Sequence, residues 1–231
     1  MVGSAYIPDP VQAQEVLDSL RRDLLADPYF SGVPSMKRSS GKTAVQFHAK
    51  NDLPEIRREV FRANSGLNIM VAVAVRRKSV LAIQRRATYQ AGVNPSQDSI
   101  YDELVGQLFR SSKFASEETH ISFARRGKAL RHQALSAAIH DATEKVAIYL
   151  TDEMMNGTPP VVESDYPTAQ AGLQIVDYCL WEIQRLFERS EDRSYKSIER
   201  CFYDIYMSSA IEDAQPFDKL IIRAVRMWKN L

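Results

Sequence analysis

The sequence predicts an α/β protein in which helices flank a sheet. Strand-like apolar segments alternate along the chain with segments whose apolar residues recur every three or four positions. Residues 67–75 (LNIMVAVAV) are apolar on both alternating faces, which is typical of a strand in the middle of a covered sheet. The chain has 231 residues, 45% of them hydrophobic, and contains no internal repeat. We therefore expect one domain with a sizeable core.

Composition excludes little but gives no sign of a membrane protein. The 30 Lys and Arg residues nearly balance the 29 Asp and Glu residues, so net charge does not argue for a polyanionic partner. The most apolar stretch, residues 69–75, is too short to span a bilayer. Cys179 and Cys201 lack Cys-x-x-Cys spacing. They indicate reduced structural thiols and a cytoplasmic protein.

The first elements are a strand and a capped helix. Residues 3–7 form a short, mostly apolar stretch that predicts the strand. Asp9-Pro10 is typical of an N-cap followed by the first helical position. The helix is predicted to run to about Ala26. Its expected buried face consists of Val16, Leu17, Leu20 and Leu24.

A polar connection is predicted next. Residues 31–44 are rich in Gly, Ser and Lys and predict an exposed, mobile loop. A short strand is expected over residues 44–48. The Asp-x-x-Glu spacing of residues 52–55 then predicts a helix start.

The remaining elements continue the alternation. We expect a helix over 99–111, a strand over 118–124, a helix ending near Leu150 and a short strand at 161–162. A helix over 173–188 follows. Periodicity alone predicts two closing helices, over 194–208 and 216–230.

The helix over 173–188 holds the most informative charge. Its apolar stripe is predicted to consist of Leu173, Val176, Leu180, Trp181, Gln184 and Phe187. Asp177 falls inside that stripe, where a carboxylate must be met by a cation, a metal or hydrogen-bond donors. Two interpretations stay open: an arginine or backbone amides satisfy it and it only fixes packing, or it is a functional ligand.

Other polar residues at strand ends and helix starts are weaker candidates. His48 ends an expected strand, and it is either catalytic or simply packed or solvated. Asp102 lies near a helix start. It either interacts favourably with the helix dipole or belongs to a functional site. Arg125 and Arg126 after a strand could clamp phosphate or remain solvated. If Asp177 meets another carboxylate across the sheet, the oxygens would hold Mg²⁺ or Mn²⁺ and activate water for phosphodiester cleavage.

Four segments resemble the bacterial family called domain of unknown function 3800. They are FHAKNDLPEIRREVF at 47–61, IYDELVGQLF at 100–109, HISFARRGKALR at 120–131 and LQIVDYCLWEIQRLFERSEDRSY at 173–195. The resemblance implies an RNase H-like mixed sheet flanked by helices and a metal-dependent nuclease or hydrolase. It also implies metal-site candidacy for Asp177 and Asp102, with His48 and Arg126 as further motif positions.

The chain departs from the family at its start. Family members begin with a strand ending in Asp-Glu-Ser-Gly, which this sequence lacks. The resemblance therefore implies an RNase H-like domain over 1–192 without its first strand, a helical extension over 193–231 packed on it, and an incomplete or inactive nuclease. The alternative is a non-catalytic module that binds protein or nucleic acid, the latter through Arg76, Arg77, Arg125 and Arg126.

Overall fold

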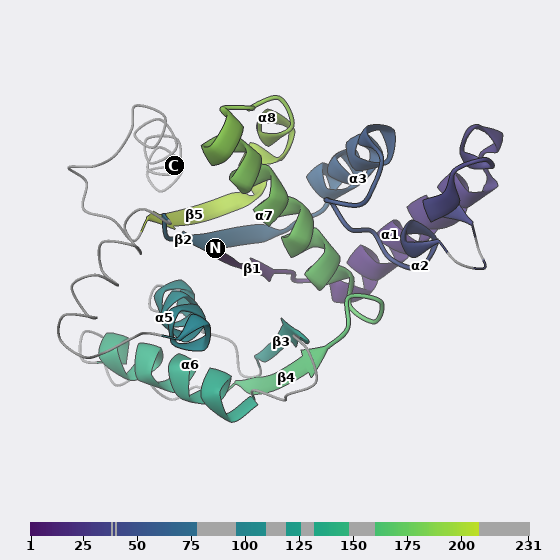
Figure 1. Ribbon diagram of the computed structural model, residues 1–231. Helices are drawn as coiled ribbons and strands as arrows, with labels where there is room; N and C mark the ends of the chain where they lie inside the picture. Colours follow the sequence, from purple (N-terminus) through teal and green to yellow (C-terminus); the bar gives the residue numbers. More distant parts are fainter. Residues whose placement is uncertain are drawn as a thin grey trace. The chain divides into compact units, whose positions relative to one another are not determined.

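The computed structural model describes residues 1–37, 39, 41–77, 96–109, 119–125, 132–147 and 160–207. It confirms the α/β class, with helices and small sheets alternating along the chain (Figure 1). The chain divides into two compact units, each built from separate segments. Of the described residues, unit 1 comprises those within 1–3, 72–165 and 205–207, and unit 2 comprises those within 4–71 and 166–204. The RNase H-like topology and the division at residue 192 stay predictions.

The N-terminal elements match the sequence prediction closely. Strand β1 spans Val2–Tyr6 and helix α1 spans Pro10–Ala26. The Asp9 carboxylate accepts a hydrogen bond from the Gln12 N–H at 2.8 Å, which satisfies one of the unpaired amides of the first turn. The fully buried residues of α1 are Ala13, Leu17 and Leu24, while Val16 and Leu20 are half-buried.

The strand predicted over 44–48 is wrong, and the segment predicted as a loop contains short helical elements. Two short 3₁₀ turns, η1 (Pro28–Phe30) and η2 (Pro34–Met36), lead into helix α2 (Lys42–Val45). Gly41 lies so close to the preceding turn that a Cβ atom there would be 2.1 Å from the Ser35 carbonyl oxygen. The glycine permits this approach, and the buried Thr43 follows it.

Helix α3 and strand β2 come next. Helix α3 spans Pro54–Gly66 and begins with its proline, so Leu53 is the N-cap and no side chain caps the helix. The predicted start is confirmed, but the Asp52 side chain does not cap it. Strand β2 spans Met70–Val75 and is largely buried, as its apolar sequence predicts.

Unit 1 contains two helices and a parallel strand pair. Helices α5 (Gln97–Phe109) and α6 (His132–Ala147) pack side by side (Figure 1). Strand β3 (His120–Ala124) pairs in parallel with β4 (Val161–Asp165), with His120 opposite Val161. The core of the unit is formed by Val2, Ala74, Leu104, Val105, Leu108, Phe109, Phe123, Leu135 and Ile139.

The chain after residue 189 contains a strand where a helix was expected. Helix α8 (Tyr195–Ile198) and the 3₁₀ turn η4 (Glu199–Cys201) are short, and strand β5 spans Phe202–Met207. Aromatic and β-branched residues in FYDIYM suit a pleated surface better than a helix, which explains the error. The three-stranded sheet has the order β1-β2-β5. The helix predicted over 216–230 lies outside the described residues.

Helix α7 spans Ala171–Arg189 and packs against α1 and α8 in unit 2. Its buried face differs from the predicted stripe and consists of Ala171, Gln174, Ile175, Tyr178, Cys179, Glu182, Ile183 and Leu186. Of the predicted stripe, Gln184 is exposed and the other members are half-buried. Apolar residues lie on nearly every side of this helix, so periodicity alone did not fix which side faces the core.

Candidate functional site

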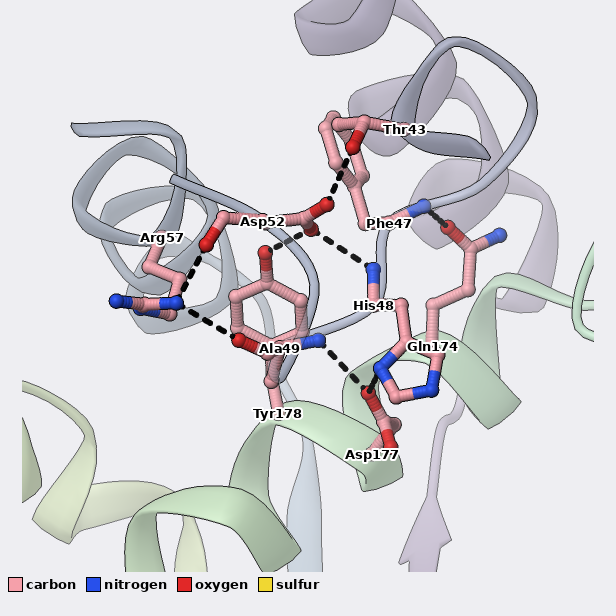
Figure 2. A network of polar contacts seen from close by, with 9 residues as sticks. All are labelled: Thr43, Phe47, His48, Ala49, Asp52, Arg57, Gln174, Asp177 and Tyr178. Carbon is pink, nitrogen blue, oxygen red and sulfur yellow. Dashed lines mark hydrogen bonds and ion pairs between the residues drawn. The ribbon is translucent and has the colours of Figure 1, made fainter. Parts of the chain in front are cut away.

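The three consecutive backbone amides of residues 47–49 each donate to a side-chain oxygen. The first donates to Oε1 of Gln174 (2.9 Å), the second to Oδ2 of Asp52 (2.8 Å) and the third to Oδ2 of Asp177 (2.9 Å). Gln174 and Asp177 are three positions apart and lie on the same side of α7. Figure 2 shows the segment fastened to the helix by these contacts. This arrangement replaces the expected strand at residues 44–48.

The Gln174 side chain connects three parts of unit 2. Its Oε1 also accepts from the Arg21 guanidinium of α1 at 2.9 Å, and its Nε2 donates to the Pro167 carbonyl at 2.7 Å. The side chain is 1% exposed, so each of these polar atoms needs a protein partner. Because both its oxygen and its nitrogen are bonded, this buried amide restricts where residue 47 can lie.

Asp52 is the buried carboxylate of the site. It is 3% exposed. Its Oδ1 accepts from the Thr43 hydroxyl at 2.7 Å, and its Oδ2 accepts from the Tyr178 hydroxyl at 2.5 Å in addition to the His48 amide. Burial raises the pKa of Asp52, and these three hydrogen bonds oppose the rise. Burial and the Asp52 charge also raise the pKa of Tyr178, so its hydroxyl remains a donor.

His48 and Asp177 form a carboxylate–imidazole pair. The distance from His48 Nδ1 to Asp177 Oδ2 is 3.3 Å, and the two side chains are 39% and 41% exposed. The contact does not have hydrogen-bond geometry, so Nδ1 of His48 has no hydrogen-bond partner among the described residues. Both contacts of Asp177 use Oδ2, and its Oδ1 accepts no hydrogen bond from the described part of the chain. One carboxylate oxygen thus remains for water or a ligand.

Two arginines contact the ring of Trp181, which lies four positions after Asp177 on α7. Nη1 of Arg57 donates to the carbonyls of Ala49 (3.0 Å) and Asp52, and its guanidinium carbon lies 4.7 Å from the Trp181 ring centroid. The guanidinium carbon of Arg185 lies at the same distance from that ring. These contacts hold both cations in fixed orientations.

The described part of the structure brings together two of the four predicted site residues. It brings His48 and Asp177 together. Asp177 is half-exposed rather than set among apolar side chains, and a backbone amide meets it, as the packing interpretation predicts. Asp102 belongs to unit 1 and is the sixth residue of α5, beyond the first turn on which the dipole interpretation rests. Arg126 lies outside the described residues. The roles of Asp102 and Arg126 stay predictions.

Sequence reasoning missed Asp52, Tyr178 and Arg57. A signal for Asp52 was present, because Pro54 at the first helical position makes Leu53 the cap and leaves Asp52 one residue too early. An aspartate that cannot cap is available for another partner. The partners of Tyr178 and Arg57 lie in other segments of the fold, so local sequence contains no comparable signal for them.

A divalent cation fits the site only in part. No group of three or more metal-ligating side chains occurs among the described residues. Both oxygens of Asp52 already accept hydrogen bonds, whereas Oδ1 of Asp177 is open. Mg²⁺ commonly takes one or two carboxylates and completes its shell with water and phosphate oxygens. Of these two carboxylates, Asp177 is therefore the one that could hold such an ion.

Comparison with protein-family models, curated proteins and solved structures finds no significant match to this chain. The resemblance to domain of unknown function 3800 therefore stays a prediction. None of the helices in the described ranges combines the length and the apolarity needed to cross a bilayer.

Proposed function

We propose that this protein is a metal-dependent phosphodiesterase of the RNase H-like class that acts on nucleic acid, with the His48–Asp177 pair at its reaction centre. The observation that carries the proposal is a half-exposed imidazole held against a carboxylate that keeps one oxygen open. Pairs of this kind transfer protons in hydrolytic enzymes. The two residues also come from two of the segments on which the family resemblance rests.

The roles of the two side chains follow from their geometry. Nδ1 faces the carboxylate, and a proton placed there would leave Nε2 as the acceptor. His48 can then take a proton from water or return one to the departing oxygen. Asp177 orients the ring, and its Oδ1 would hold Mg²⁺ or Mn²⁺, which supplies charge neutralisation at the phosphate. The Ala49 amide fixes the carboxylate for both tasks.

Hydrolysis of bis(p-nitrophenyl) phosphate and of labelled single-stranded RNA and DNA tests the proposal. We expect turnover that requires Mg²⁺ or Mn²⁺ and falls by about 10²-fold or more in His48→Gln and Asp177→Asn. Asparagine retains an oxygen for the Ala49 amide, so the fold is preserved. Glu188→Gln is the matched control, because it removes one exposed carboxylate from the same helix and should leave the rate unchanged.

Thermal unfolding gives an independent readout. Divalent metal should raise the melting temperature of the wild type, and Asp177→Asn should abolish that increase. A wild type that is inert on all substrates and equally stable with and without metal contradicts the proposal. Binding of nucleic acid without cleavage would instead favour the non-catalytic module. Of the four arginines suggested for that module, Arg76 is already paired with Glu103.

A further inference from the structure

A stripe of half-exposed residues runs along α7 from the reaction pair. Asp177, Trp181 and Arg185 are four positions apart in turn, so each lies about one helical turn, about 6 Å, from the next. Arg57 of α3 reaches the middle of this stripe through its contact with Trp181. The proposed reaction uses only the Asp177 end, and it gives the two cations no role.

Both guanidiniums keep donors that no protein group accepts among the described residues. Arg57 donates only through Nη1, to the carbonyls of Ala49 and Asp52, so its Nε and Nη2 donate to no described residue. Arg185 donates through Nε (2.7 Å) and Nη2 to one oxygen of Glu191, which leaves Nη1. In Figure 2 the unbonded terminal nitrogen of Arg57, Nη2, points away from the His48–Asp177 pair, so one phosphate does not bridge this nitrogen and the pair.

Arginine in a fixed orientation suits recognition of phosphate oxygens. Its planar group donates to two oxygens at once, and stacking on an aromatic ring reduces the freedom lost on binding. The Arg57 group is fixed by two carbonyls as well as by the ring. The exposed fraction of the Arg185 side chain is 27%, so it is partly shielded from solvent yet reachable.

We propose that Arg57 and Arg185, held against Trp181, form a phosphate-binding subsite for a nucleic-acid strand that passes the His48–Asp177 pair along α7. The inference rests on the proposed function and deepens it by naming where the strand next to the cleaved bond is held. Trp181 serves as the support for the cations. The recognition is of the backbone, so it does not depend on base sequence.

Fluorescence anisotropy with a labelled single-stranded oligonucleotide, in EDTA so that no cleavage occurs, tests the subsite. Arg185→Gln should lower affinity about fivefold and reduce the slope of log K against log salt by about 0.7. Arg57→Lys keeps the charge but loses the planar donor group, and should lower affinity about threefold. Arg62→Gln is the matched control, since Arg62 is an exposed arginine of α3 paired with Glu59. It should bind as the wild type does.

A gain of affinity separates this role from a structural one. Glu191→Gln removes the carboxylate that occupies Arg185, so affinity should rise about threefold, which a damaged fold would not produce. Absence of binding by the wild type, equal loss in Arg62→Gln and Arg185→Gln, or no gain in Glu191→Gln each overturns the subsite. If the oligonucleotide binds in a manner that depends on Arg185 but is not cleaved when metal is added, only the hydrolytic function is contradicted. If the wild type cleaves nucleic acid and Arg185→Gln binds the oligonucleotide with unchanged affinity, only the subsite is contradicted.

Discussion

Asp52 and Glu182 are two buried carboxyls of unit 2 with opposite surroundings. They are 3% and 2% exposed, so burial penalises the charge of both. Asp52 accepts three hydrogen bonds on its two oxygens. Oε2 of Glu182 has no hydrogen-bond partner among the described residues, and burial raises the pKa of Glu182 to about 7. Burial also raises the pKa of Asp52, but its three donors oppose the rise, so we expect the donors supplied by the fold to decide how much each buried charge costs.

The largest expected effect is the loss of the Asp52 carboxylate. Asp52→Ala leaves the Thr43 and Tyr178 hydroxyls and the His48 amide without an acceptor in the protein interior. We expect the free energy of unfolding to fall by about 3–5 kcal/mol in urea titrations. Asp9→Ala, which removes an exposed helix cap, should cost only about 1 kcal/mol. If Asp52→Ala lowers the free energy of unfolding no more than Asp9→Ala does, the hydrogen bonds to Asp52 do not set it apart from Glu182.

The Glu182 carboxyl should make stability depend on pH. Its pKa in the folded protein, about 7, lies above its ordinary value of 4.5, so the folded state binds the proton more tightly. Its contribution to stability is therefore complete below about pH 4.5 and is lost as pH rises through about 7. Glu182→Gln cannot ionise. The variant should gain about 2–3 kcal/mol relative to wild type between pH 5 and pH 8.

Urea titrations of both proteins at pH 5 and pH 8 measure this difference. Comparing each variant with wild type at the same pH removes the contribution of every other titrating group. If Glu182→Gln and the wild type respond identically to pH, Glu182 is charged at little cost and the comparison fails.

Two buried tyrosine hydroxyls also differ in whether they have a hydrogen-bond partner, and the expected effect on stability is smaller. The Tyr178 hydroxyl donates to Asp52, whereas the buried Tyr195 hydroxyl has no hydrogen-bond partner among the described residues. Tyr178→Phe should cost about 2 kcal/mol, because it removes a hydrogen bond to a carboxylate and keeps the ring contact with Phe61. Tyr195→Phe should be close to neutral in the same denaturation experiment. Equal costs would mean that the Asp52 contact adds nothing.

The smallest expected effect concerns Thr43. Thr43→Val keeps the shape of the side chain but removes the donor to Oδ1 of Asp52, and should cost about 1 kcal/mol. Thr43→Ser retains the hydroxyl, so thermal melting should place it closer to wild type than the valine variant. The reverse order would show that packing, not the hydrogen bond, makes Thr43 matter.

The sequence predicted those elements whose signals are local. Both ends of α1 follow from the Asp9-Pro10 start and the apolar spacing, and β2 follows from its apolar run. The helix expected at 194–208 failed because its second half pairs as β5, which tertiary context decides. In the candidate site, Asp177 and His48 were singled out separately. Their contact depends on side chains that hold residues 47–49 on α7, and no local pattern encodes that.

The bonds of Gln174 have a consequence for how the chain is made. They join positions 153 and 127 residues apart, because unit 2 is built from segments on both sides of residues 72–165. During synthesis on the ribosome, residues 4–71 emerge long before their partners in 166–204. Their apolar side chains stay uncovered for that interval, so high contact order should make assembly of this unit slow and dependent on chaperones.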